Sequence, residues 1–253
     1  MKFAVVGDPI AHSKSPRMHA AAYAALGMSH TYEAIRAGAG ELSAVVARLR
    51  AGELAGLNVT VPHKVRVLDL VDAVAPSAAA VGAANTLVRD LGGRITAHNT
   101  DVPALAAELA ALAPLPGAAL VLGTGGASRA AVAALRDSLH VARVVVRGRP
   151  LSADASADAD VTLVIQTTSC GMPGADPGEL AKDGVAWDAL AAGAVALDVV
   201  YAPFETPFLA EARRRGLRAE NGLGMLARQG ALAFELWLGV TAPLDVMRAA
   251  LTA

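Results

Sequence analysis

Short apolar segments alternate with alanine-rich segments of helical period along most of this chain. The segments expected to form strands are Lys2 to Val6, Thr31 to Arg36, Gly56 to Val61, Ala119 to Leu122, Ala142 to Val146, Val161 to Gln166 and Val195 to Val200. Strands separated by helices are typical of βαβ units, whose strands lie parallel in one sheet. The alternation therefore predicts an α/β protein with mostly parallel strands.

Local signals mark where the first helices begin and end. Ser15 is suited to cap the first helix, Pro16 to occupy its first position and Gly27 to close it. A second helix is expected from Glu41 to Arg50. One pair of strands departs from the βαβ pattern, because the runs 87–90 and 94–97 flank two glycines and predict a β-hairpin.

Length and proline content favour two domains. A chain of 253 residues suits either one large α/β domain or two modest ones. The segment from Ala113 to Gly117 holds Pro114 and Pro116, which end a helix and precede a new strand, so a domain boundary is expected there. The segment from Gly224 to Ala253 predicts two amphipathic helices, the second beginning at Pro243.

Composition excludes several classes of function. With 22 basic and 23 acidic residues and 4% aromatic residues, the chain lacks both the charge and the stacking groups of a nucleic-acid surface. No apolar run approaches the ~20 residues that span a bilayer, so no membrane partner is expected. The opening MKFAVVGDPI is interrupted by Asp8 and indicates a first strand rather than a signal peptide, which predicts a cytoplasmic protein. A single cysteine, Cys170, and scattered histidines predict no disulfide and no metal.

A glycine-rich loop carries the clearest cofactor signal. The strand ALVL is followed by the run Gly123, Thr124, Gly125, Gly126, Ala127, Ser128 and then by the helical SRAAVAALRD. A tight turn from a buried strand into a helix places unpaired N–H groups where a pyrophosphate can bind, which favours a dinucleotide site. The competing interpretation is a glycine turn needed only for close packing.

The end of the next strand bears on which dinucleotide is bound. Arg147, Gly148 and Arg149 stand where an NAD site has an Asp or Glu for the free ribose 2′-hydroxyl. An arginine there favours a 2′-phosphate and therefore NADP. The alternative is a basic turn that faces water, as many surface arginines do.

Two further segments suggest an acid/base site. NVTVPHK runs from Asn58 to Lys64 and HNTD from His98 to Asp101, and each ends a strand-like run on a residue that can carry charge. A lysine and a carboxylate that converge on one polar pocket can exchange a proton with a ligand. The alternatives are a solvated lysine at a helix start and an aspartate that caps the helix PALAAELAAL.

Eight motifs, in order along nearly the whole chain, resemble the shikimate dehydrogenase family. They are HSKSP (12–16), NVTVPHK (58–64), GAANTL (82–87), NTD (99–101), GTGGASRA (123–130), DVVYAP (198–203), TPFL (206–209) and GLGMLARQG (222–230). The resemblance implies NADPH-dependent reduction of 3-dehydroshikimate to shikimate in aromatic amino acid biosynthesis. It also implies a substrate domain of residues 1–101 plus 222–253, an inserted, doubly wound, Rossmann-like nucleotide domain of residues 102–221, and a cleft between them.

The resemblance also assigns roles to individual residues. It implies that Lys64 is the catalytic acid/base and Asp101 its partner at the substrate. Residues that match substrate-binding positions are Ser13, Ser15, Thr60, Asn85, Tyr201 and Gln229. Residues expected at the cofactor are Gly123, Thr124, Gly125, Gly126, Ala127, Arg147, Val199 and Gly222. The expected partner is this small-molecule substrate, and the expected species is a monomer or homodimer.

The sequence departs from the family at three places. Val102-Pro103-Ala104 replaces a glycine-containing turn, Val146-Arg147-Gly148 replaces Asn-Arg-Thr, and the segment 150–160 is too short for the usual crossover. Two alternatives therefore stay open. One is a quinate or aminoshikimate dehydrogenase, which can be NAD-linked. The other is a catalytically silent protein that binds shikimate, against which the retention of both Lys64 and Asp101 argues.

Overall fold

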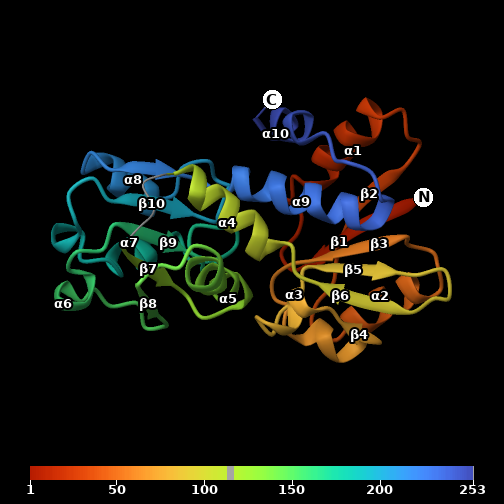
Figure 1. The fold of residues 1–253 in the computed structure, drawn as a ribbon, viewed down its shortest axis with the longest axis horizontal. Helices are drawn as coiled ribbons and strands as arrows, with labels where there is room; N and C mark the ends of the chain where they lie inside the picture. The colour runs from red at the N-terminus through yellow and green to blue at the C-terminus, as the bar shows by residue number, and fades with distance from the viewer. Residues whose placement is uncertain (113–116, 253) are drawn as a thin grey trace. The chain divides into compact units, whose positions relative to one another are not determined.

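The structure is a computed structural model that describes residues 1–112 and 117–252 and forms two compact units (Figure 1). Unit 1 comprises Met1–Ala104 and Leu226–Ala253, and unit 2 comprises Leu105–Met225. The division falls inside two helices, α4 (Asp101–Ala111) and α9 (Leu223–Leu238). The boundary expected over 113–117 lies, except for its last residue, outside the described residues.

Unit 1 is built on a six-stranded mixed sheet in the order β2-β1-β3-β5-β6-β4. Its strands are β1 (Lys2–Gly7), β2 (Thr31–Arg36), β3 (Gly56–Val59), β4 (Ala73–Val74), β5 (Thr86–Arg89) and β6 (Ile95–His98). β1 pairs in parallel with β2 and β3, whereas β5 is antiparallel to both β3 and β6. The predicted hairpin is confirmed and carries the chain from β5 to the start of α4.

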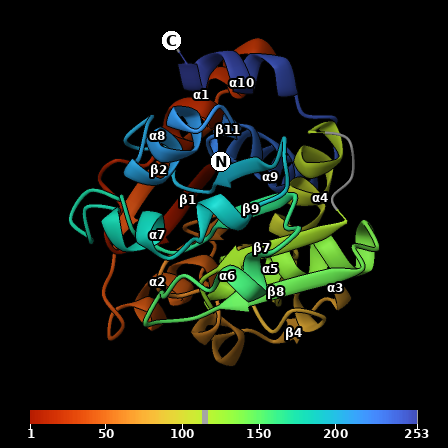
Figure 2. The same ribbon diagram turned by 90° about the vertical axis from the view of Figure 1, so that its left-hand side faces the viewer.

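Helices cover the sheet of unit 1. They are α1 (Ser15–Ala25), α2 (Leu42–Arg50), the short α3 (Pro76–Ala79), a 3₁₀ turn (Arg66–Leu70) and α10 (Leu244–Thr252), which packs against α1 (Figures 1 and 2). The buried face of α2 joins one core with alternate residues of β1 and β3. Ser15 is the first residue of α1 rather than its cap, because Lys14 occupies the cap position and makes no side-chain capping bond.

Unit 2 contains a five-stranded parallel sheet in the order β11-β10-β9-β7-β8. Its strands are β7 (Ala118–Leu122), β8 (Arg143–Arg147), β9 (Leu163–Gln166), β10 (Val195–Asp198) and β11 (Arg218–Glu220). Its helices are α5 (Gly126–Ala133), which continues into a π turn (Ala134–Ser138), α6 (Ala155–Asp158), α7 (Glu179–Asp183), a 3₁₀ turn (Trp187–Ala189) and α8 (Pro207–Arg214). Two α/β units, the second with a parallel Rossmann-like sheet, confirm the predicted fold class.

The shortened segment after β8 still contains one helical turn. α6 has four residues and is capped by Asp154, whose carboxylate accepts hydrogen bonds from the backbone N–H groups of Ser156 and Ala157, each at 3.0 Å. No helix is expected there from the sequence, because the segment is rich in turn-forming residues. A capping aspartate lets even this short segment form one.

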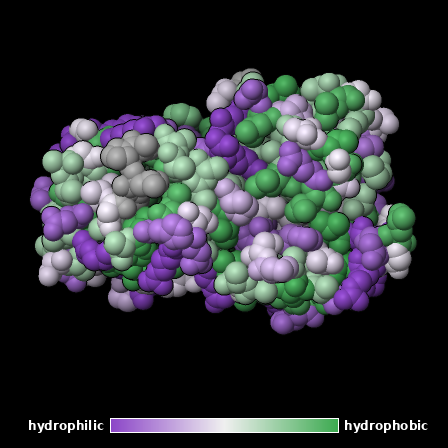
Figure 3. All heavy atoms as spheres, viewed as in Figure 1, coloured by the Kyte–Doolittle hydropathy of each residue, from purple (hydrophilic) through white to green (hydrophobic). Residues whose placement is uncertain are grey.

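In the described residues, no helix has the length and apolar character needed to cross a bilayer. On the face drawn in Figure 3, hydrophilic and hydrophobic residues are intermixed rather than gathered into one apolar band.

An aromatic cluster fills one side of the core of unit 1. The buried ring of His19 stacks on Tyr32 with 4.2 Å between ring centroids, and Tyr23, Phe234 and Trp237 surround it. In the part of the chain that the structure describes, neither ring nitrogen of His19 has a hydrogen-bond partner. Burial lowers the pKa of His19 to about 3, so the ring is held neutral.

We expect His19→Phe to remove part of the acid sensitivity of folding. The unfolded chain protonates a histidine below about pH 6.5 while the folded chain does not, so His19 costs stability as the pH falls. The cost is about 2 kcal/mol between pH 7 and pH 5. Urea unfolding of both proteins across this range should show wild type losing more stability than the variant. An equal loss of stability in wild type and variant between pH 7 and pH 5 would contradict a neutral His19 in the folded protein.

Candidate active site

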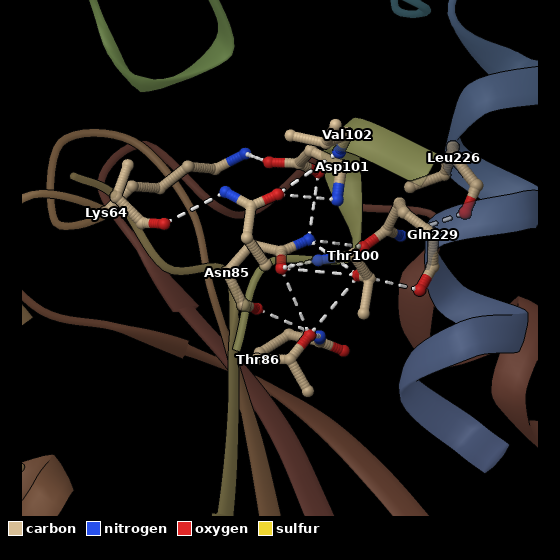
Figure 4. Close-up of polar contacts among 11 residues, drawn as sticks. Lys64, Asn85, Thr86, Thr100, Asp101, Val102, Leu226 and Gln229 are labelled. Carbon is tan, nitrogen blue, oxygen red and sulfur yellow. Dashed lines mark hydrogen bonds and ion pairs between the residues drawn. The ribbon is translucent and has the colours of Figure 1, made fainter. Parts of the chain in front are cut away.

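Lys64 and Asp101 form a sheltered ion pair in unit 1 (Figure 4). Lys64 lies in the loop that follows β3, and Asp101 is the first residue of α4, separated from β6 by Asn99 and Thr100. Lys64 Nζ donates to Asp101 Oδ2 at 2.6 Å, and the side chains are 15% and 3% exposed. The lysine and carboxylate thus meet, as the two sequence segments predict.

The N-terminus of α4 is capped by Asn99 rather than by Asp101. Asn99 Oδ1 accepts the backbone N–H groups of Asp101 at 3.0 Å and Val102 at 3.1 Å. The Asp101 carboxylate is therefore free to bind side chains. It also lies in the first helical turn, where the positive end of the helix favours a negative charge.

Asn85 holds the second oxygen of that carboxylate. Asn85 Nδ2 donates to Asp101 Oδ1 at 2.9 Å, and Asn85 Oδ1 accepts the backbone N–H of Thr100 at 2.8 Å. A backbone N–H can only donate, so the Asn85 amide must turn its NH₂ toward Asp101. Gln229 on α9 joins the cluster, since its Oε1 lies 3.3 Å from Asn85 Nδ2 and its Nε2 donates to Leu226 O at 2.9 Å.

This arrangement presents a proton donor on a fixed support. The two carboxylate oxygens of Asp101 are shared between Lys64 and Asn85, so the carboxylate is held in place and in turn directs the Lys64 side chain. A partly exposed ammonium has three donors and spends one on Asp101. The site can therefore give a proton to a ligand and regain it from solvent.

The remaining predicted substrate residues lie at three places. Thr60 shares the loop of Lys64, and its carbonyl accepts the N–H of His63 at 2.8 Å. Ser13 and Ser15 lie at the start of α1, where Ser13 Oγ accepts the N–H of Ser15 at 3.3 Å. Tyr201 is half-buried in unit 2, after the end of β10.

The glycine loop of unit 2 has the form expected of a phosphate-binding turn. Gly123 adopts φ +116°, which favours glycine, and Ser128 Oγ, the buried replacement for the third glycine, donates to Gly123 O at 2.7 Å. A Cβ built on Gly125 would meet no atom within 4 Å, so open space lies beside the first turn of α5. The N–H groups of that turn, from Gly126 onward, have no intrahelical partner. The loop therefore fits a pyrophosphate.

Val199 and Gly222, both expected near a nicotinamide, lie against each other. A Cβ on Gly222 would collide with the backbone carbonyl of Val199, so only glycine permits this approach. The N–H of Gly222 donates to Val200 O at 3.3 Å. The two segments after β10 and β11 thus meet at the same edge of the sheet as the glycine loop.

Arg147 neither faces water nor keeps its donors free for a phosphate, in contrast to both expectations from the sequence. Its guanidinium donates to both Asp158 oxygens, at 3.0 and 2.7 Å, and to Gly184 O at 2.6 Å. The side chains of Arg147 and Asp158 are 10% and 0% exposed. Because its donors are directed to α6 and to the end of α7, Arg147 holds the shortened segment on the sheet.

Arg149, two residues later, is exposed. Its guanidinium contacts Cys170 Sγ at 3.7 Å, a weak acceptor that is given up at little cost. Between the two arginines, a Cβ on Gly148 would lie 3.0 Å from Thr124 Cγ2, which places this turn beside the glycine loop. Arg149 is therefore the more available of the two arginines.

Sequence reasoning missed Thr86 and Thr100 as members of the site. Thr100 Oγ1 donates to Gln229 O at 3.0 Å, and Thr86 Oγ1 lies 3.2 Å from Asn85 Oδ1 (Figure 4). The available signal is that both threonines follow an asparagine at a strand end, in GAANTL and HNTD.

Within residues 1–112 and 117–252, no three His, Cys, Asp or Glu side chains gather as a metal site requires.

We expect Arg147→Met to lower stability and Arg147→Met with Asp158→Leu to recover most of it. The single change leaves a buried carboxylate without its cation, which costs about 3–5 kcal/mol, whereas an apolar pair of similar volume is close to neutral. Urea unfolding of the three proteins measures both effects. A single variant that unfolds like wild type but no longer binds NADPH would instead make Arg147 a cofactor ligand.

Family models match both ends of the chain. The model described as the shikimate dehydrogenase substrate binding domain matches residues 5–87, and the model described as the shikimate 5′-dehydrogenase C-terminal domain matches residues 222–252. Together they cover parts of both units, including the strand and loop before Lys64 and the helix that carries Gln229.

Full-length comparisons agree with these matches. The chain is 42% identical to the shikimate dehydrogenase (NADP(+)) of Acidiphilium cryptum, over 95% of this chain and 91% of that protein. It is 40% identical to the enzyme of the same name from Symbiobacterium thermophilum, over 97% and 92%. The solved structure of shikimate 5-dehydrogenase from Thermus thermophilus, in complex with NADP(H) and shikimate, is similar with a TM-score of 0.84 and 36% identity, covering 99% of this chain and 98% of that one.

Proposed function

The chain belongs to the shikimate dehydrogenase family, and from this membership we propose that it catalyses the reversible, NADPH-dependent reduction of 3-dehydroshikimate to shikimate. The observation that carries the proposal is the sheltered Lys64–Asp101 pair, held from behind by Asn85. The reduction of a ketone needs an acid/base pair of this kind. A protein that only binds shikimate does not need one.

The residues of unit 1 supply the proton in this reaction. NADPH, when bound, supplies the hydride that converts the ring ketone to an alkoxide. The Lys64 ammonium gives one proton to that oxygen and recovers it from solvent, and the reverse reaction begins with the neutral amine. Asp101 keeps the Lys64 side chain directed, while Asn85 prevents the carboxylate from turning away.

The other predicted residues divide between substrate and cofactor. We assign Ser13 and Ser15 to the substrate carboxylate, since short hydroxyl groups at the start of α1 suit an anion. Thr60, in the same loop as Lys64, Gln229, which contacts Asn85, and Tyr201 of unit 2 are assigned to the ring hydroxyls. Tyr201 rests on the motif match alone.

For the cofactor, the glycine loop from Gly123 to Ala127 is assigned to the pyrophosphate, and Val199 and Gly222 to the nicotinamide. Arg149 takes over the 2′-phosphate role that the sequence gives to Arg147, because Arg147 is occupied by Asp158. Because Arg147 is bound by Asp158, the second candidate function is that of an NAD-linked quinate or aminoshikimate dehydrogenase. Such an enzyme discriminates less between NADP and NAD. As the sequence predicts, we place the reaction in the cytoplasm, with a monomer or homodimer as the active species.

We expect Lys64→Ala to lower kcat for 3-dehydroshikimate reduction by about 10²- to 10⁴-fold, the usual contribution of a positioned proton donor. The dissociation constant of shikimate should change far less, because the hydroxyl at the reacting carbon is only one of the several polar groups through which shikimate binds. NADPH absorbance decay gives kcat, and calorimetric titration gives the binding constant. An equal loss of binding and turnover would argue against the acid/base role.

We expect Arg149→Gln to weaken NADPH about 10- to 100-fold and to leave NADH unchanged, since one charge-assisted hydrogen bond is worth about 1.5–3 kcal/mol. Arg143→Gln is the matched control, because Arg143 is also exposed but lies at the other end of β8 and donates to Ala157 O at 2.8 Å. Titration with adenosine 2′,5′-bisphosphate and with ADP tests the same discrimination without turnover. Similar losses for both ligands would remove Arg149 from the 2′-phosphate site.

A further inference from the structure

A line of buried hydrogen bonds runs from the aromatic cluster to the Lys64–Asp101 pair. Tyr32 Oη donates to Asn58 Oδ1 at 2.7 Å, and Asn58 Nδ2 donates to Thr86 Oγ1 at 3.0 Å. Thr86 Oγ1 in turn donates to Asn85 Oδ1 at 3.2 Å. Asn85 Nδ2 then donates to Asp101 Oδ1 (Figure 4). We call Tyr32, Asn58 and Thr86 the relay.

The direction of the relay is set by backbone groups. Asn58 Nδ2 faces the carbonyl of Asn85 at 3.0 Å, and a carbonyl can only accept, so the amide must turn its NH₂ that way. Its Oδ1 is then left toward Tyr32, which must donate. Since Thr86 Oγ1 accepts from Asn58, the hydroxyl proton of Thr86 is available to Asn85.

Burial makes each member dependent on the next. Asn58, Asn85 and Thr86 are 5%, 2% and 0% exposed, so water does not readily replace a missing partner. A buried polar atom that loses its partner pays its full desolvation cost. An Asn58 without Tyr32 is therefore expected to move, and the movement passes to Thr86 and Asn85.

The Lys64–Asp101 pair depends on Asn85, the last residue of this line of hydrogen bonds before Asp101. Asn85 is the group that fixes Asp101 Oδ1, and the Asp101 carboxylate in turn directs the Lys64 ammonium. The line reaches the carboxylate at the Asn85 amide, so an effect of Tyr32 or Thr86 on catalysis passes through Asn85.

We propose that Tyr32 and Thr86 are positioning residues for proton transfer, and that the relay keeps Asn85 in the one orientation that supports the Lys64–Asp101 pair. The proposal rests on the proposed function for its kinetic consequence. It goes beyond that function because it assigns a role in turnover to a tyrosine and a threonine that do not touch the substrate.

The test uses the loss of single hydroxyl groups. We expect Tyr32→Phe to lower kcat about tenfold, which corresponds to about 1.4 kcal/mol, with little change in KM for 3-dehydroshikimate. Thr86→Val should do the same, and Thr86→Ser, which keeps the hydroxyl, should restore kcat.

Tyr23→Phe is the matched control within the same aromatic cluster. Within the described chain the buried hydroxyl of Tyr23 has no hydrogen-bond partner, so its removal should leave kcat unchanged. If Tyr32→Phe and Thr86→Val lower the melting temperature and leave kcat at the wild-type value, the relay is structural only and the proposal is overturned.

A measurement without turnover separates this proposal from the proposed function. The ¹³C chemical shift of the Asp101 carboxyl group reports its hydrogen bonding directly. It should move in Tyr32→Phe and Thr86→Val and stay in place in Tyr23→Phe, whether or not the wild type reduces 3-dehydroshikimate. An unchanged shift in the first two variants would overturn the relay, whereas an inactive wild type with the expected shifts would overturn only the function.

Discussion

The sheltered ion pair between Lys64 and Asp101 is the interaction on which the candidate active site of unit 1 depends. A carboxylate at 3% exposure is stable only if both oxygens are bound, and Lys64 and Asn85 bind one each. That demand fixes the end of β6, where Asn99 takes over the capping of α4. It also fixes the Asn85 amide, and through it the relay of buried side chains.

Unit 2 also contains a buried ion pair, but this pair holds a segment of the fold in place rather than forming a candidate catalytic site. Its buried pair joins Arg147, at the end of β8, to Asp158 in the segment 150–160, which is shorter than the family resemblance implies. Here the charges bind a single helical turn to the sheet rather than a ligand. We therefore propose that the recognition of a 2′-phosphate falls to an exposed neighbour, Arg149, next to the glycine loop.

Patterns of period and of local chemistry predicted much of this structure. Alternating strands and helices indicated the fold class, and the glycine run after β7 indicated the position of the tight turn into α5. Contacts that depend on where a side chain points from its strand could not be predicted from the sequence. Arg147 points toward Asp158 because of its place on β8, and HNTD offers three possible capping residues in a row, so packing alone selects Asn99. Tyr32 gave no local signal because its partner, Asn58, lies 26 residues further along the chain.

Chemical rescue of Lys64→Ala tests the central claim most directly. The assay is single-turnover reduction of 3-dehydroshikimate by NADPH in the Lys64→Ala protein. Added primary amines should restore a rate that rises with amine concentration, and small amines should restore more of it than large ones. The wild-type rate should be unaffected. A Lys64→Ala protein that binds shikimate and NADPH normally, but is insensitive to every amine, would contradict the assignment of Lys64 as the proton donor.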